Sequence, residues 1–195
     1  MARPKFYPTS TLLDAARDLA VEGGVPAATV DAIAKLTGAS SGSIYHRFGS
    51  RGGVLIAAWQ RAVTSFHDGF VVALAEPEAR EAALGGARWV IEFSRRHGQD
   101  ATLLATVRPD EVFAGAPPSA RGDEAVAHEL KALTRRLTGT SSVAAVQRVQ
   151  MAIVDLPYGV VRRYLAFGQP IPRALEPDVC VAVSALLDNI TKEQT

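Results

Sequence analysis

The sequence predicts an all-α protein, because apolar residues recur at helical spacing along most of the chain and no segment alternates as a β-strand would. Hydrophobic residues make up 48% of the 195 residues, which is ample for a folded core. Near the N-terminus, two short helical patterns flank a Gly-containing turn. Together these observations predict a small N-terminal three-helix domain, residues 1–51, and a larger C-terminal helical bundle, residues 52–195.

The first helix of the N-terminal pair is predicted to begin after Thr29 and to end at Gly38. Thr is a good N-cap residue, and Gly adopts the left-handed backbone conformation that commonly ends a helix. Val30 and Ile33 lie one turn apart and begin its buried face. We therefore expect a short amphipathic helix followed by a tight turn.

A second helix follows, and Ser40 is its predicted N-cap, accepting from the amide of Gly42 or Ser43. Ile44 and Phe48, at i and i+4, give this helix its buried face. The residues that point away from that face or flank it are small or polar: Ser41, Gly42, Ser43, Tyr45 and His46. Such a helix suits the major groove of DNA, where recognition helices of helix-turn-helix proteins contact base edges.

A composite motif surrounds this pair of helices. It reads LLDAA, a Leu, a Gly-containing turn, Thr-Val-x-x-Ile-Ala, Gly-x-Ser-x-Gly-x-Ile-Tyr-x-x-Phe, and Ser-Arg before Leu. Its fixed points are Leu12–Ala16, Leu19, Gly23, Thr29–Ala34, Gly38, Ser40, Gly42, Ile44, Tyr45, Phe48, Ser50, Arg51 and Leu55. Through this motif, residues 12–55 resemble the DNA-binding region of tetracycline-repressor (TetR) family regulators.

The resemblance implies a homodimeric, ligand-responsive regulator that binds a double-stranded DNA operator, most simply as a repressor. It assigns the Thr29 hydroxyl and the first amides of its helix to a phosphate, as helix N-termini bind anions. Phosphate contacts are also expected from Tyr45, His46 and Arg51, and a basic N-terminal arm includes Lys5. Ser41, Gly42 and Ser43 at the start of the recognition helix are expected to face bases, and the N-cap Ser40 is also counted among the DNA-binding residues.

Two departures from the family pattern matter. Ser41 stands where a Lys or Pro is common, which removes one possible phosphate contact. Gly52 and Gly53 replace helix-favouring residues, and each Gly inside a helix costs about 1 kcal/mol relative to Ala. We therefore expect a loose start to the helix that links the two domains.

In the C-terminal domain, apolar spacing predicts helices up to residue 76 and over residues 78–97, 100–106, 123–137, 142–167 and 176–191, with a long loop at 108–122. Pro157 predicts a kink near Asp155 and Leu156. By the resemblance, the last two helices pair with a second copy in a four-helix bundle; an internal core is the alternative. The predicted dimer interface is Val146, Val149, Ile153, Val179, Val183, Leu186, Leu187 and Ile190.

Aromatic and flexible apolar side chains in the C-terminal domain are candidates for the walls of an effector pocket. These residues are Phe66, Phe70, Trp89, Phe93, Phe113, Met151 and Tyr158. The alternative is that they form ordinary core. A pocket of this composition predicts a largely hydrophobic or aromatic ligand rather than a sugar or nucleotide.

Other classes of function find less support. Gly38–Gly42 matches the G-x-S-x-G pattern of a hydrolase, but that motif needs a strand before its serine, so we expect no catalytic residue. Four His and one Cys show no metal-ligand spacing, and neither a metal nor a cofactor is expected.

The remaining features indicate a cytoplasmic protein. The single Cys excludes an internal disulfide, and the sequence shows neither a membrane span nor a signal peptide. Residues 1–55 carry six basic and four acidic side chains, a mild excess. Together with Ser41, this weak excess keeps one alternative open, a carrier or interaction protein of the same fold that does not bind DNA.

Overall fold

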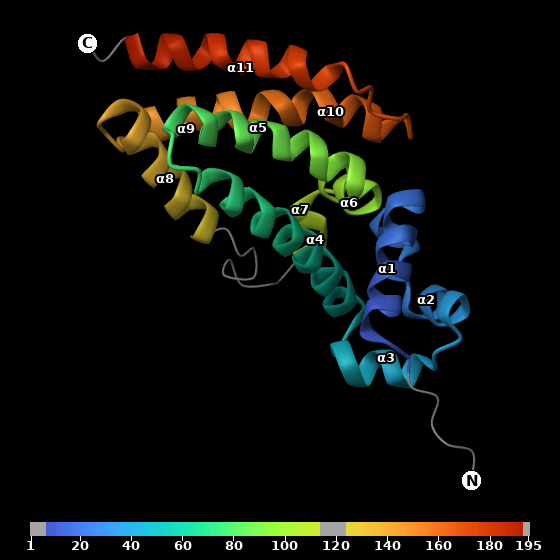
Figure 1. Cartoon of the computed structure of the whole chain (residues 1–195). Coiled ribbons are helices and arrows are strands. Elements are labelled where there is room, and N and C mark those ends of the chain that lie inside the picture. Colours follow the sequence, from blue (N-terminus) through green and yellow to red (C-terminus); the bar gives the residue numbers. More distant parts are fainter. Residues whose placement is uncertain (1–6, 114–123, 193–195) are drawn as a thin grey trace. The chain divides into compact units, whose positions relative to one another are not determined.

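The computed structural model describes residues 7–113 and 124–192, and every regular element in these ranges is a helix (Figure 1). The predicted all-α fold is thus confirmed. The chain forms two compact units, Met1–Val63 with Gln99–Arg121 and Thr64–Gly98 with Gly122–Thr195. This division differs from a single boundary after residue 51, because helix α4 (Arg51–Leu74) runs from the first unit into the second.

The first unit contains the start of α4 and six shorter elements. These are α1 (Thr9–Gly23), a 3₁₀ helix (Val25–Ala27), α2 (Val30–Thr37), α3 (Ser41–Phe48), α6 (Gly98–Thr106) and α7 (Pro109–Val112). Leu12, Ile33, Ile44 and Val54, from four different helices, are fully buried in one cluster. This cluster fixes α3 against α1, α2 and α4.

A second cluster of the first unit joins α4 to α6 and α7. Trp59 meets Phe113 edge to face, with ring centroids 6.1 Å apart, and Leu103 is buried beside them. The predicted loop at 108–122 was therefore wrong at its start. Pro109, placed in the first turn of α7, suits a helix N-terminus, and buried Phe113 holds the turn in place.

Charged side chains also tie α6 to α1 and α4 within this unit. Arg17 of α1 contacts Asp100 of α6 at 2.9 Å, and both side chains are largely shielded from solvent. Arg61 of α4 contacts Asp14 of α1 at 2.7 Å and lies 3.9 Å from Asp100. Because these residues come from α1, α4 and α6, the ion pairs connect the same part of the unit that the apolar cluster of Trp59, Leu103 and Phe113 holds together.

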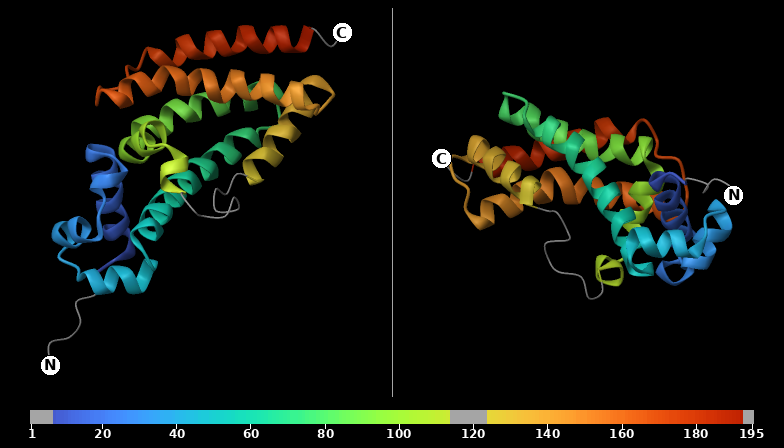
Figure 2. Two further views of the ribbon diagram at one scale, coloured as in Figure 1. Left: turned by 180° about the vertical axis from the view of Figure 1, so that it is seen from behind. Right: turned by 90° about the horizontal axis from the view of Figure 1, so that it is seen from below.

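The second unit contains the rest of α4 and a bundle of helices. They are α5 (Ala79–Arg96), α8 (Glu124–Thr138), α9 (Val143–Gln150), a π-helical turn (Met151–Asp155), α10 (Leu156–Ala166) and α11 (Leu175–Lys192). Both figures of the ribbon show α11 running beside α10 and α5 (Figures 1 and 2). The predicted helices over 78–97, 142–167 and 176–191 are present, with ends that differ by one or two residues.

The π-helical turn lies where the sequence predicted an irregularity. Pro157 has no N–H to donate to the carbonyl four residues back, and its ring crowds that carbonyl. The helix accommodates this by a wider turn at Met151–Asp155, directly before α10. The expected disturbance near Asp155 therefore takes the form of a π-turn inside one long run of helix.

The interior of the second unit holds much of the predicted dimer interface. Six of its eight residues are buried within the unit: Val149, Ile153, Val179, Val183, Leu187 and Ile190. Val146 and Leu186 are half-buried. The apolar spacing of α9 to α11 thus marks the faces that these helices turn toward α5 and toward one another.

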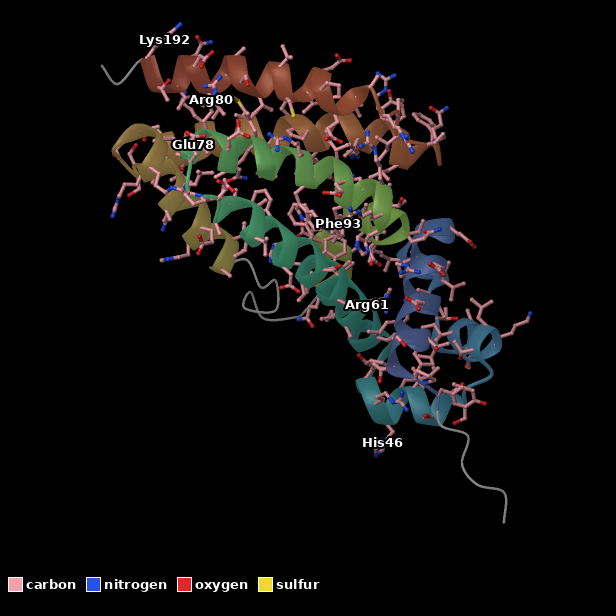
Figure 3. The ribbon with its side chains drawn as sticks, viewed as in Figure 1. His46, Arg61, Glu78, Arg80, Phe93 and Lys192 are labelled. Carbon is pink, nitrogen blue, oxygen red and sulfur yellow. The ribbon has the colours of Figure 1, made fainter. Side chains whose placement is uncertain are left out.

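Helix α5 begins with a carboxylate cap. Glu78 accepts hydrogen bonds from the backbone N–H groups of Arg80 and Glu81. These two hydrogen bonds lower the pKa of the Glu78 carboxyl group below its ordinary value of 4.5, and the bond from the Arg80 amide has the larger effect. Figure 3 shows Glu78 and Arg80 at the start of this helix.

We expect Glu78→Ala to lower the melting temperature at neutral pH. Because the folded-state pKa is lowered, the contribution of Glu78 is present above pH 4.5 and is lost as the pH falls through the folded value. The melting difference between wild type and variant should therefore shrink in acid. Glu76→Ala, which removes a nearby carboxylate that caps no helix, is the matched control, and an equal loss in both variants at neutral pH would contradict the cap.

Candidate functional site

Helices α2 and α3 each begin with the N-cap that the sequence predicted. Thr29 Oγ1 accepts from the Ala32 amide at 3.1 Å, and Ser40 Oγ accepts from the Ser43 amide at 3.2 Å. Gly38 ends α2 with φ at +73°, a conformation that favours glycine. The helix-turn-helix is therefore fixed by side-chain caps and one left-handed residue.

Helix α3 buries one side and exposes the other. Ile44 is fully buried, whereas Tyr45 is 51% exposed and His46 is exposed. Figure 3 shows His46 projecting outward from α3. Gly42 is also exposed, and a Cβ added there would meet nothing within 4 Å. The predicted outward face is thus present, and its backbone at Gly42 is open to close approach.

Ser41 makes a contact that the sequence did not indicate. Its hydroxyl donates to Asp31 Oδ1 of α2 at 3.1 Å, with both side chains near the surface. The pair places a carboxylate beside the start of the recognition helix. A carboxylate there accepts hydrogen bonds from base edges but repels phosphates.

Arg47, on the recognition helix, and Arg51, at the start of α4, bind main-chain carbonyls. Arg51 donates from Nε to the Ala28 carbonyl at 3.1 Å and from Nη2 to the Val25 carbonyl. Arg47 donates to the Tyr7 carbonyl at 2.7 Å. Arg51 is predicted to bind a phosphate, and in the structure its guanidinium contacts the loop before α2. Arg47 was missed, because nothing in a single sequence marks which cation folds back onto the chain.

The start of α4 is packed tightly against the end of α3. A Cβ on Gly53 would lie 2.0 Å from the Phe48 carbonyl oxygen, which no side chain tolerates. Ser50 Oγ accepts from the Gly53 amide at 3.0 Å. Gly53 is therefore required by this close approach, and α4 begins at Arg51 despite the two glycines that predicted a loose start.

Lys5 lies outside the described residues, so the predicted basic arm is not placed. The remaining predicted DNA contacts all lie on or beside α2 and α3: Thr29, Ser40, Ser41, Gly42, Ser43, Tyr45, His46 and Arg51. Caps, buried Ile44 and the Arg51 contacts bring them to one end of the first unit. The sequence motif therefore corresponds to one contiguous surface.

A cavity of about 390 Å³ lies in the second unit, between α4, α8, α9 and the π-helical turn. Its apolar walls include Phe66, Phe70, Leu130 and Val154. Polar groups come from three residues, His67, Lys131 and Gln150. The volume falls within the range of about 300–1,000 Å³ typical of small-molecule sites.

Two of the seven predicted pocket residues, Phe66 and Phe70, line this cavity. Phe93 is buried core behind Phe66, with ring centroids 5.3 Å apart, and Trp89 donates from Nε1 to the Phe66 carbonyl at 2.8 Å. These two residues support the wall without forming it. The spacing of aromatic residues in the sequence does not distinguish side chains that line the cavity from side chains that pack behind its wall.

The other three predicted pocket residues lie elsewhere. Phe113 belongs to the first unit, beside Trp59, and Met151 is 44% exposed on the helix surface. Tyr158 is half-buried, and burial raises the pKa of its hydroxyl, while the positive charge of Arg162 and a hydrogen bond with it oppose that shift. None of the three contributes to the cavity described above.

Groups suited to other chemistry are not assembled in the described residues. Ser40 follows helix α2 rather than a strand, and its hydroxyl caps α3. Among residues 7–113 and 124–192, no cluster of three His, Cys, Asp or Glu side chains could hold a metal ion. The described helices also include none that is long and apolar enough to cross a membrane.

The helix-turn-helix segment is similar to that of a known protein family. Residues 12–58 match the family model for bacterial regulatory proteins of the tetR family. No match was found among curated proteins.

Solved structures share the fold over nearly the whole chain. The TetR family transcriptional regulator PfmR from Thermus thermophilus is 17% identical, with a TM-score of 0.67 over 93% of this chain and 97% of that chain. The fatty acid degradation regulator FadR from Bacillus halodurans is 18% identical, with a TM-score of 0.69 over 94% and 98%. A TetR-like regulator from Rhodococcus sp. RHA1 is 22% identical, with a TM-score of 0.62 over 95% and 96%. Residues 12–58 thus carry the DNA-binding segment of the tetR family, and the fold over nearly the whole chain is the one found in solved TetR-family regulators.

Proposed function

We propose that this protein is a homodimeric repressor that leaves its operator when a hydrophobic small molecule binds its second unit. The observation that carries the proposal is the outer face of α3, where Gly42, Tyr45 and His46 are exposed and Ser43 is half-buried, on the side away from buried Ile44. A rigid helix with a small, polar outer face suits the major groove. Two such helices in a dimer would read two half-sites about one helical turn apart.

Phosphate binding would rest on helix N-termini and exposed polar side chains. The amides at the start of α2, beside Thr29, and the side chains of Tyr45 and His46 are the proposed anchors. Arg51 is proposed to act indirectly, by holding the loop before α2 through the Val25 and Ala28 carbonyls. Arg51 is therefore proposed to maintain the conformation of the helix-turn-helix, and its positive charge is not proposed to contact a phosphate.

The surfaces of α10 and α11 that face away from the core support a dimer through these helices. Val181 is 71% exposed, and Ala182 and Ala185 lie exposed on the same side of α11. Phe167, after the end of α10, is 78% exposed, and Met151 is 44% exposed. Small residues allow helices to approach closely, and exposed large apolar residues favour a partner. We propose this outward set in place of the buried residues predicted from the sequence.

The ligand response is proposed to start in the cavity beside Phe66 and Phe70. Helix α5 of the second unit is followed directly by α6, whose Asp100 is bound to Arg17 of α1. A ligand that favours one arrangement of the second unit would thus act on the DNA-reading unit through continuous chain. The size of the response equals the ratio of the ligand's affinities for the two states.

Gel-shift titration with the intergenic DNA that flanks the gene tests the DNA-binding proposal. We expect a discrete complex that a specific unlabelled fragment displaces and unrelated DNA does not. Thermal-shift screening then supplies ligands, because a molecule that binds the native state raises the melting temperature. A stable, ligand-binding protein without a specific DNA complex would favour the carrier alternative.

Arg51 provides a sharper test of the DNA-reading unit. We expect Arg51→Ala to destabilise the protein by about 1–3 kcal/mol, because two carbonyls lose a charged donor. Operator binding should weaken while its salt dependence stays at the wild-type slope. Arg51→Lys keeps the charge but not the two-carbonyl geometry and should resemble the Ala variant. The opposite result would place Arg51 on a phosphate: the salt-dependence slope of Arg51→Ala would fall by about one per lost contact, and Arg51→Lys would restore the wild-type slope.

The dimer proposal is tested at Val181. Val181→Glu places two like charges near a two-fold axis, so we expect a monomer with much weaker operator binding. The control is Val72→Glu on α4, because Val72 is similarly exposed at 74% and lies outside the proposed interface. Light scattering coupled to size exclusion measures both. An intact dimer for Val181→Glu, or a monomer for Val72→Glu, would move the interface elsewhere.

A further inference from the structure

We infer that the cavity of the second unit binds a molecule with an apolar body and a single carboxylate head, which Lys131 holds. This inference rests on the proposed function in one respect, that the cavity beside Phe66 and Phe70 is the effector site. It adds the chemical class of the ligand. Shape, wall composition and the placement of charge around the cavity each contribute to it.

The walls require an apolar body. Phe70 is fully buried and Leu130 is 5% exposed, so the deep part of the cavity is continuous with the core. Phe66 stacks on Phe70 with ring centroids 5.4 Å apart, and edge-on contact with Phe93 fixes its ring from behind. A preformed wall of this kind leaves ligand hydroxyl groups without partners, which disfavours sugars.

The charge at the cavity is one-sided. Lys131 of α8 lines it, and no carboxylate does among the residues that the structure describes. Three arginines of the second unit are in ion pairs, Arg80 with Asp188, Arg88 with Glu81 and Arg95 with Glu176, whereas Lys131 is an exposed side chain at the rim of the cavity. Lys131 forms no ion pair or hydrogen bond with any described residue. A ligand carboxylate would supply the missing counter-charge.

The neighbouring polar group favours a monoanion. Gln150 of α9 lines the same cavity and has an amide that can donate to a second carboxylate oxygen. Phosphate groups are generally bound by several cations or by a bidentate guanidinium. The single ammonium of Lys131 and the single amide of Gln150 are better suited to a carboxylate. The ligand is therefore amphipathic, with its charge at the Lys131 side and its body against Phe66 and Phe70.

Calorimetric titration of the full-length protein with decanoate and with 1-decanol tests this inference directly. The two probes share an apolar body and differ in the head. We expect decanoate to bind at least about tenfold more tightly, as one charge-assisted hydrogen bond provides. Lys131→Gln should abolish that preference and leave 1-decanol binding unchanged.

Arg135→Gln is the matched control, because it removes a cation from the same helix that does not line the cavity. It should keep the preference for decanoate. Equal binding of both probes by wild type, no binding of either, or an unchanged preference in Lys131→Gln would each overturn the inference. Val126→Trp, which fills the cavity, should weaken both probes, and unaffected binding would place the ligand elsewhere.

Operator binding in the presence of decanoate separates this inference from the proposed function. Binding that depends on Lys131 without any change at the operator would support the ligand class and contradict the effector role. Release of the operator by molecules whose affinity ignores Lys131 would support the effector role and overturn the ligand class.

Discussion

The structure depends on guanidinium groups that bind main-chain carbonyls where helices end or loops turn. Carbonyls at these places have no partner within a helix, and leaving them unpaired when shielded from water is costly. Arg51 holds the loop before α2, and Arg47 holds the chain before α1. In the second unit, Arg136 binds the Leu74, Glu76 and Pro77 carbonyls after α4, and Arg95 binds the Pro172 carbonyl before α11. These contacts fix the ends of helices, whereas the apolar clusters fix their faces.

This use of arginine shapes how the protein would meet DNA. Two cations nearest the recognition helix are engaged with the chain itself, and Asp31 adds a negative charge beside Ser41. The proposed affinity then rests on helix N-termini and exposed side chains, which contribute less to salt-dependent attraction than free arginines would. The preference for particular base sequences, in contrast, would come from contacts between base edges and the small side chains on the outer face of α3. A reader of this kind would gain specificity at some expense in non-specific binding.

The sequence predicted the fold where local rules decide it and was less successful where packing decides. Caps at Thr29 and Ser40 and the turn at Gly38 are set by neighbouring residues, so they were predictable. Apolar spacing on α9 to α11 marked a buried face but not what buries it, and six expected interface residues are core. In the same way, Phe66 and Phe70 line the cavity while Phe93 lies behind them. Gly53 was interpreted as a weakness, whereas its approach to the Phe48 carbonyl makes it necessary.

The outer face of α3 is proposed to read DNA in a two-fold symmetric complex. Selection of binding sites from a random duplex library by the full-length protein, repeated with Ser43→Ala, measures this most directly. We expect an enriched palindrome whose half-sites are about one helical turn apart, and a Ser43→Ala consensus that changes at the same position in each half-site. Failure to enrich any sequence, or an identical consensus for both proteins with no change in base preference at any position, would contradict it.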